Sequence, residues 1–339
     1  MPELRRDPIV PRWVVFSPER ARRPQHLKSL EAEDGEELCP FCEGREENTP
    51  AEILAYRADA TTPNASGWRV RVVPNKFPAL KVEEPLSRRG EGIYDWVAGV
   101  GAHEVIIECP HHETRAARLG TQQLQDVLWA YRDRIVDLKR DARLRHVIVF
   151  KNQGALAGAT LEHAHSQLIA APVALPEVQI EIEGATRYYQ QHERCVFCDI
   201  VHEEQQTQRR LIAESNHFVA VAPYAARFPF ETWILPRQHA SHFEELSHQS
   251  VQDLAQMMHR ILVLLDDALD EPALNYVIHT APFEPAALPQ YHWHIEILPR
   301  IAGVAGFELG AGCFINPVYP EKATAFLRDR RLRAVAHVP

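Results

Sequence analysis

The same series of short motifs occurs twice along this chain of 339 residues. Each series begins with a Cys-x-x-Cys pair, continues through apolar runs and a helix-like stretch, and ends in a His-x-His tract. The spacing repeats as well, because His163 follows His112 by 51 residues and His292 follows His239 by 53. Because the order of the motifs and their spacing nearly match, we predict an internal duplication, which restricts the fold to two similar halves.

Apolar periodicity predicts one long helix and several strands in each half. Apolar residues recur at steps of three and four over 124–138 and again over 251–269. Thr121 and Ser247 stand where side chains that cap a helix are expected. Short apolar runs predict strands over 104–108, 146–150, 231–235 and 276–279. Each half is therefore expected to be a small sheet with a packed helix, which is an α+β pattern.

Composition and length bound the domains and the partners. We place the two halves at residues 1–175 and 176–339, each long enough for its own core. The start, Met1–Asp7, carries no apolar stretch behind its charges, and no apolar run is long enough to cross a bilayer. We therefore expect a cytoplasmic protein without a membrane partner. A net charge of −9 without a long Lys/Arg cluster argues against nucleic acid, but not against a small phosphorylated ligand.

Four of the six cysteines form two pairs, Cys39–Cys42 and Cys195–Cys198. Without a secretory signal a disulfide framework is not expected, and a two-residue gap lets both thiolates of a tight turn face one zinc ion. A redox pair is the alternative, but it usually opens a helix within a thioredoxin-like pattern that surrounds neither pair. Buried free thiols are the remaining alternative.

We predict that two histidines complete a closed Cys2His2 set in each half. The predicted ligands are Cys39, Cys42, His112 and His163 in the first set, and Cys195, Cys198, His239 and His292 in the second. Because a closed tetrahedral set leaves no open position for substrate, both zinc ions are expected to be structural. His111 competes with His112, and His242 competes with His239. His103 is interpreted as a strand residue that makes a hydrogen bond.

The duplication leaves His165 and His294 as equivalent second histidines. On an extended strand a period of two places His163, His165 and Gln167 on one face. Two residues after the second histidine, the first half has Gln167 whereas the second has Glu296. An amide can donate to a phosphate oxygen, but an ionised carboxylate would repel it. We therefore predict that the first half carries the chemistry and that the second is a degenerate scaffold copy.

The segment from Val149 to Gln167 resembles galactose-1-phosphate uridylyltransferase, a branch of the histidine-triad superfamily with a duplicated fold. Further family segments are matched by residues 17–24, 73–80, 228–232 and 306–308. The resemblance covers nearly the whole chain. It implies two tandem histidine-triad-like repeats, each an antiparallel sheet with packed helices.

The resemblance implies nucleotidyl transfer by a ping-pong mechanism. His165 would attack the α-phosphorus of a nucleotide-sugar, release a sugar 1-phosphate, and hold the nucleotide until another phosphate acceptor collects it. Imidazole suits this role because it is a neutral nucleophile near pH 7 and a competent leaving group. We expect a neighbouring carbonyl, at Ala164 or beyond, to fix its tautomer through Nδ1. Gln167 would hold a non-bridging oxygen.

The resemblance also implies the substrate contacts and the partners. Asn152 and Thr160 would support the phosphates or the sugar, and Asn75 and Phe77 would border the base and ribose. Arg20 and Arg23 are expected to contact phosphate, partly across a dimer interface. Phe307 and Glu308 are expected to contact the sugar. The expected partners are thus a nucleotide-sugar, a sugar 1-phosphate and a second copy of the chain.

Three departures from the family pattern bear on the substrate. Ala164 and Ser166 replace the Pro and Gly of the common His-Pro-His-Gly-Gln motif, and residues 306–317 lack a glutamine that reaches the hexose. The second predicted metal set uses a Cys-x-x-Cys pair instead of a carboxylate and histidines. These features are closer to a sister branch, the ADP-glucose:phosphate adenylyltransferases.

The leading hypothesis is uridylyl transfer from UDP-glucose to galactose 1-phosphate, and phosphorolysis of ADP-glucose is the alternative. A non-catalytic, zinc-stabilised nucleotide-binding module would also fit the metal sets. It would not explain why Gln167 and the loop at 152–158 occur only in the first half.

Overall fold

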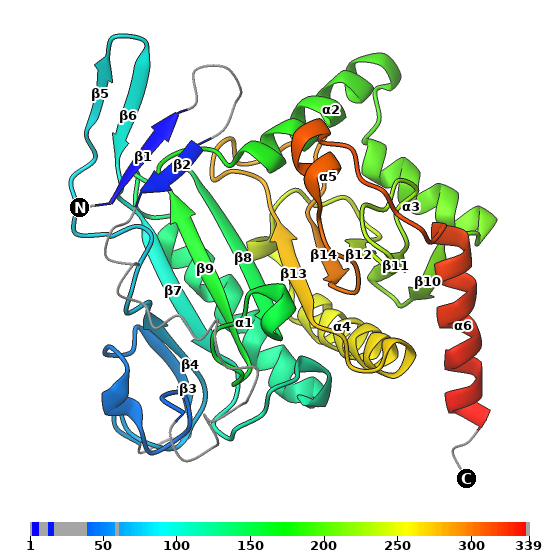
Figure 1. Ribbon diagram of the computed structural model, residues 1–339, viewed down its shortest axis with the longest axis horizontal. Coiled ribbons are helices and arrows are strands. Elements are labelled where there is room, and N and C mark those ends of the chain that lie inside the picture. The colour runs from blue at the N-terminus through cyan, green and yellow to red at the C-terminus, as the bar shows by residue number, and fades with distance from the viewer. Residues whose placement is uncertain (1, 7–12, 17–38, 58–60, 337–339) are drawn as a thin grey trace.

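A ten-stranded antiparallel sheet forms the middle of the molecule (Figure 1). The computed structural model describes residues 2–6, 13–16, 39–57 and 61–336. In spatial order the sheet contains β10 (Leu211–Glu214), β11 (Phe218–Val221), β12 (Thr232–Pro236), β14 (His294–Pro299), β13 (Leu274–His279), β8 (His146–Gln153), β9 (His165–Ala171), β7 (Ala102–Ile107), β4 (Trp68–Pro74) and β3 (Leu54–Arg57). The four predicted strand runs correspond to β7, β8, β12 and β13, with ends that agree to within three residues.

The strand order is the same in both halves when each is read outward from the centre of the sheet. The first half reads β8-β9-β7-β4-β3 and the second reads β13-β14-β12-β11-β10, which confirms the internal duplication. The two inner strands pair with each other, so that Phe150 lies opposite Val277 and Asn152 opposite Asn275. Each half is thus a sheet with a packed helix, as expected, and the two sheets join edge to edge into one. Pairing β8 with β13 removes an exposed edge from each half.

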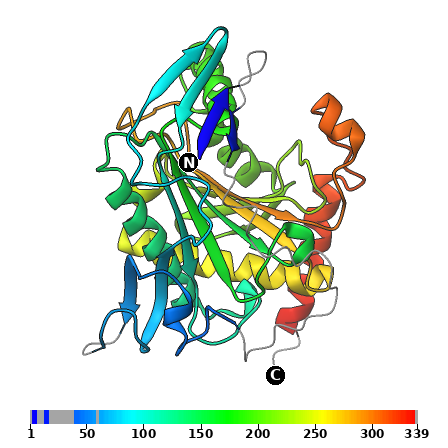
Figure 2. The ribbon, with the colours of Figure 1, turned by 60° about the vertical axis from the view of Figure 1, so that its left-hand side comes forward.

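Two long helices, α1 (Thr121–Leu138) and α4 (His248–Leu269), lie side by side against the sheet and share one hydrophobic core with it (Figure 2). The predicted apolar stripes supply the helical side of this core. Ser247 caps α4, since its Oγ accepts from the Ser250 N–H at 3.1 Å. Thr121 is not a cap: the extended residue Gly120 occupies that position, and Thr121 is already helical.

The remaining elements surround this core. Strands β1 (Glu3–Arg6), β2 (Trp13–Phe16), β5 (Arg88–Glu91) and β6 (Tyr94–Ala98) form a second sheet in the order β2-β1-β6-β5. The other helices are α2 (Pro176–His192), α3 (Val196–Thr207), α5 (Gly306–Ala311) and α6 (Pro320–Ala336), and the 3-10 turns are Glu46–Asn48, Ala116–Arg118, Ala155–Ala157 and Phe243–Glu245. Helix α5 stands away from the rest of the chain in Figure 2. None of the described helices combines the length and the apolar character needed to span a bilayer.

Candidate active site and metal centres

The His-x-His-x-Gln tract lies beside a cavity of about 500 Å³ in the first half. Strand β9 places His165 and Gln167 on the face that lines this cavity, and its neighbours β7 and β8 hold it on both sides. The cavity also brings together Asn75 and Phe77, which follow β4, and Thr160, which precedes β9. Five of the residues predicted to bind substrate or to take part in catalysis therefore line one cavity.

The tautomer of His165 follows from one hydrogen bond. Its Nδ1 lies 2.7 Å from the carbonyl oxygen of His163. Because a carbonyl can only accept, Nδ1 carries the proton and Nε2 keeps a lone pair for attack on an electrophile. The expectation that the Ala164 carbonyl fixes this tautomer is wrong by one residue, since that oxygen accepts from the Glu108 N–H at 3.1 Å.

A hydrogen-bond chain orients the amide of Gln167. The Ala79 N–H donates to His103 Nδ1 at 2.9 Å, so His103 carries its proton on Nε2. That Nε2 lies 2.9 Å from Gln167 Oε1, and Asn75 Nδ2 lies 3.4 Å from the same oxygen. With Oε1 used in this way, the Gln167 NH2 group remains to donate to a ligand.

His103 is the site residue whose role the sequence did not indicate. It lies in β7 with a hydrogen bond, as expected, and its side chain is buried. Only the pairing of β7 with β9, in which Val105 lies opposite Gln167, brings it to the Gln167 side chain. The sequence offers one signal for this placement: His103 precedes Val105 by two residues, so both side chains lie on the same face of the strand.

The loop between β8 and β9 depends on glycine. Gly154 has a φ of +82° and Gly158 a φ of +83°, a region that side-chain-bearing residues rarely adopt. A Cβ on Gly154 would also lie 2.9 Å from the Cβ of Ala273. The loop therefore turns tightly enough to return the chain through Thr160 to His165.

The structure brings the four predicted ligands of the first metal set together. Their ligand atoms all lie within 4.8 Å of one another. Cys42 Sγ lies 3.4 Å from His112 Nδ1 and 3.6 Å from His163 Nδ1, and Cys39 Sγ lies 3.5 Å from His163 Nδ1. Tetrahedral zinc with ordinary bond lengths requires a sulfur–nitrogen separation of about 3.6 Å. His111 does not belong to the group.

The protonation of His163 also suits a metal ligand. Its Nε2 lies 2.9 Å from the Cys109 carbonyl, so Nε2 carries the proton and Nδ1 is free to coordinate. Burial lowers the pKa of His163 to about 4, which keeps the imidazole neutral at physiological pH. The first set therefore fits a structural zinc ion in geometry and in protonation.

The second metal set has the same arrangement but is more open to solvent. Cys198 Sγ lies 3.5 Å from His239 Nδ1 and 3.6 Å from His292 Nδ1, and all four ligand atoms lie within 4.8 Å of one another. His239 is exposed, whereas every member of the first set is at least partly buried. The competing residue His242 points elsewhere, with its Nε2 3.0 Å from the Pro282 carbonyl.

The second half differs from the first in the surroundings of its His-x-His tract. His294 is fully buried and packs against the rings of Phe197 and Trp233, whose centroids lie 5.3 Å and 4.9 Å away. Trp233 lies opposite Glu296 just as Val105 lies opposite Gln167, so a tryptophan fills the space that the cavity occupies in the first half. This packing buries His294, whereas its counterpart His165 lines a cavity.

A third group of possible metal ligands lies beside His294. Glu181, His279, His294 and Glu296 bring two imidazoles and two carboxylates within 4.8 Å of one another. The sequence does not indicate this group, because Glu181 lies far from the other three residues in the chain. Glu181 Oε1 already lies 2.8 Å from His279 Nδ1, and the Arg227 guanidinium pairs with Glu296. The group is thus partly neutralised by protein cations.

Other predicted substrate contacts are not brought to this cavity. Arg20 and Arg23 lie outside the described residues. Phe307 and Glu308 lie on α5 and are not among the described residues that line the cavity. Instead, Glu308 accepts from the Ala305 N–H at 3.0 Å and caps its own helix.

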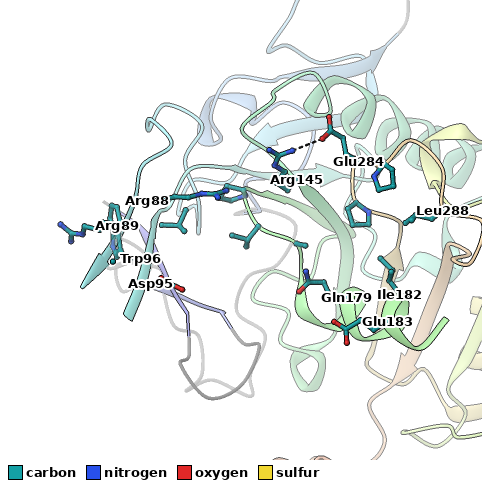
Figure 3. A pocket seen from close by; sticks show the side chains of 17 residues that line it. Arg88, Arg89, Asp95, Trp96, Arg145, Gln179, Ile182, Glu183, Glu284 and Leu288 are labelled. Atoms are coloured by element: carbon teal, nitrogen blue, oxygen red, sulfur yellow. Dashed lines mark hydrogen bonds and ion pairs between the residues drawn. The ribbon is translucent and has the colours of Figure 1, made fainter. Parts of the chain in front are cut away.

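A larger hollow of about 920 Å³ lies elsewhere, between the β5–β6 hairpin, the start of α2 and the loop before β14 (Figure 3). Arg145 and Glu284, which both line it, form an ion pair at 3.1 Å. The described residues that line it include no histidine, cysteine or other evident nucleophile. Its size alone therefore does not make it the site of group transfer.

Comparison with known proteins shows similarity over nearly the whole chain. Family models for the N-terminal and C-terminal domains of galactose-1-phosphate uridyl transferase match residues 1–174 and 181–336. ADP-glucose phosphorylase of Arabidopsis thaliana is 39% identical over 335 residues, which cover 97% of this chain and 93% of that protein. Galactose-1-phosphate uridylyltransferase of Thermotoga maritima is 27% identical over 338 residues, covering 97% and 98%.

Solved structures show the same similarity. The crystal structure of the Arabidopsis thaliana ADP-glucose phosphorylase with bound ADP-glucose has a TM-score of 0.76 at 37% identity, covering 97% of this chain and 99% of that one. A uridylyltransferase structure has a TM-score of 0.82 at 27% identity, covering 98% and 99%.

Proposed function

The chain belongs to the galactose-1-phosphate uridylyltransferase family, and from this premise we propose that it transfers a nucleotidyl group through a covalent bond to His165. The observation that carries the proposal is the hydrogen bond from His165 Nδ1 to the His163 carbonyl. It supports a nucleophilic Nε2 at the wall of a cavity of about 500 Å³.

In the first step, the lone pair of Nε2 forms a bond to the α-phosphorus of a nucleotide-sugar. The bond from that phosphorus to the bridging oxygen breaks, and the electron pair leaves with the sugar 1-phosphate. The ring gains positive charge, which the His163 carbonyl stabilises at Nδ1–H. In the second step, a phosphate oxygen of the acceptor attacks the phosphorus and the nitrogen–phosphorus bond breaks, so neutral His165 is restored.

The neighbouring residues are proposed to bind the phosphates. Gln167, whose oxygen faces His103, would donate its NH2 group to a non-bridging oxygen of the α-phosphate. Asn152 and Thr160 would contact the phosphates or the sugar. Asn75 and Phe77 would border the base and the ribose, since both line the cavity next to His165.

We propose ADP-glucose as the donor and inorganic phosphate as the acceptor. The support is the 39% identity to ADP-glucose phosphorylase over almost the full chain, compared with 27% to the uridylyltransferase of Thermotoga maritima. The second Cys2His2 set, which departs from the carboxylate–histidine pattern of the uridylyltransferase branch, points in the same direction. Uridylyl transfer from UDP-glucose to galactose 1-phosphate is the second candidate, and the two family models favour it.

We propose that zinc occupies both Cys2His2 sets in a structural role, because neither closed set leaves a position for substrate. A cytoplasmic location would keep the four thiols reduced for this purpose.

A homodimer is also proposed. Helix α5 and the segment after it expose large apolar side chains, including Leu309 at 79% and Ile315 at 67%. A second copy would cover this surface and would receive Phe307 and Glu308 near its own cavity.

The test is the intact mass of the zinc-loaded protein after incubation with ADP-glucose or UDP-glucose in the absence of acceptor. An adenylyl adduct that inorganic phosphate discharges supports the phosphorylase. A uridylyl adduct that galactose 1-phosphate discharges supports the second candidate instead. Absence of any adduct with either donor, in folded protein, contradicts covalent transfer and favours a binding module.

A further inference from the structure

Three polar residues lie in a row across the junction of the two halves. In the pairing of β8 with β9, Lys151 lies opposite Ser166, so the next residue, Asn152, is the neighbour of His165. In the pairing of β8 with β13, Asn152 lies opposite Asn275. Directly opposed residues of antiparallel strands point to the same face. The row thus runs from the nucleophile through Asn152 to a residue of the second half.

The Ala157 carbonyl determines which way both amides of this row point. Asn275 Nδ2 lies 2.9 Å from the Ala157 oxygen, and because a carbonyl only accepts, the NH2 group of Asn275 must face it. The same NH2 group lies 2.8 Å from the side chain of Asn152, which must therefore present its oxygen there. The NH2 group of Asn152 is then directed away from Asn275.

The Asn152 amide is available for a ligand in this orientation. Its side chain is half-buried, and no described residue accepts a hydrogen bond from its Nδ2. The second half also supports the loop at this point, because Ala273 packs against Gly154 while Asn275 holds Ala157. One strand of the second half therefore fixes both the loop and the donor beside His165.

We propose that Asn275 is a positioning residue for phosphoryl transfer: it orients Asn152 so that the NH2 group of Asn152 donates to the phosphate that His165 attacks. This inference rests on the proposed function. If Asn275 has this role, the second half contributes to the reaction and is more than a scaffold. Its contribution comes from β13, and the His-x-His tract of the second half takes no part.

The variant Asn275→Asp tests the proposal with almost no change in shape. A carboxylate cannot donate to the Ala157 carbonyl or to Asn152 Oδ1, so Asn152 would rotate its NH2 group toward Asp and its oxygen toward the phosphate. We expect nucleotidyl-His165 to form about 10- to 100-fold more slowly at saturating ADP-glucose. Gln208→Glu is the matched control, because it removes an amide donor to a backbone carbonyl on the exposed end of α3.

A double-mutant cycle separates this role from a purely structural one. If Asn275 acts through Asn152, then Asn275→Asp slows the Asn152→Ala protein by no more than about twofold. Fully multiplicative effects would overturn the inference, and so would a wild-type rate of adduct formation in Asn275→Asp. If Asn275→Asp fails to fold, as judged by zinc content and thermal unfolding, the uncharged variant Asn275→Ala must show the same dependence on Asn152. A wild-type protein that forms no adduct overturns the proposed function and this inference together.

Discussion

His163 and His165 are connected through the backbone carbonyl between them. The carbonyl of His163 accepts from His165 Nδ1 at 2.7 Å, while the imidazole of His163 lies 3.5 Å from the Cys39 thiol. One residue thus contributes its side chain to the first metal set and its main chain to the orientation of His165, the proposed nucleophile. The second half has the equivalent contact, with His294 Nδ1 3.2 Å from the His292 carbonyl, but there His294 is buried beneath aromatic rings.

This connection predicts that the two metal sets affect activity differently. Cys39→Ser and Cys195→Ser are each expected to lose one zinc ion per chain, measured by elemental analysis. Loss of the first ion frees the His163 ring, so we expect nucleotidyl-His165 to form at least about tenfold more slowly. Cys195→Ser should keep most of the rate in the folded protein. Equal rates in the two variants would contradict the connection.

His165→Ala should abolish the covalent adduct, because no other imidazole is presented to the cavity by the described residues. Far-ultraviolet circular dichroism and zinc content should remain those of the wild type. His294→Ala is the comparison, since it changes the equivalent histidine. It should form the adduct at close to the wild-type rate, although the cavity it leaves lowers the free energy of unfolding by about 2–4 kcal/mol.

Gln167→Glu should slow nucleotidyl transfer by about 100- to 1,000-fold. His103 can still donate to the new side chain, but a carboxylate then faces the phosphate where the NH2 group was. The reciprocal change, Glu296→Gln, leaves Arg227 paired with Glu231 and should not alter the rate. Single-turnover kinetics with the nucleotide-sugar would measure both variants, and a wild-type rate in Gln167→Glu would exclude the proposed phosphate contact.

The free energy of unfolding should decrease as the pH is lowered, because of His146. Burial lowers the pKa of His146 from 6.5 to about 4, and its Nδ1 accepts from the Leu175 N–H at 3.1 Å. The unfolded chain therefore protonates His146 at a higher pH than the folded protein does. The contribution of neutral His146 to the free energy of unfolding is complete above pH 6.5 and is lost as the pH falls toward 4. The loss amounts to about 3 kcal/mol.

His146→Gln checks this pH dependence. Glutamine cannot ionise, so the slope of unfolding free energy against pH should flatten between pH 6.5 and 4. At neutral pH the variant should be less stable by about 1–2 kcal/mol, because the Leu175 N–H loses its acceptor. Urea unfolding at several pH values gives both quantities, and an unchanged slope would show that other groups dominate.

The sequence by itself determined the features that depend on local period and spacing. The repeated motif order predicted the duplication, apolar residues at three- and four-residue steps predicted α1 and α4, and the paired cysteines with their spaced histidines predicted two ligand sets. The contrast of Gln167 with Glu296 predicted which half is reactive, and the packing of Trp233 beside His294 supports that prediction. The duplication, the two helices and the grouping of the ligands could be predicted because each rests on residue type and on the distance along the chain, whereas the choice of the reactive half stays a prediction.

Only the tertiary structure decided what depends on register between distant strands. The shared ten-stranded sheet, the contact of His103 with Gln167 and the contact of Asn275 with Asn152 all join residues far apart in sequence. The choice of the His163 carbonyl over that of Ala164 depends on where the chain enters β9. Hydrogen bonds require positions accurate to a few tenths of an ångström, and such positions are set by strand pairing and packing, which motif spacing does not encode.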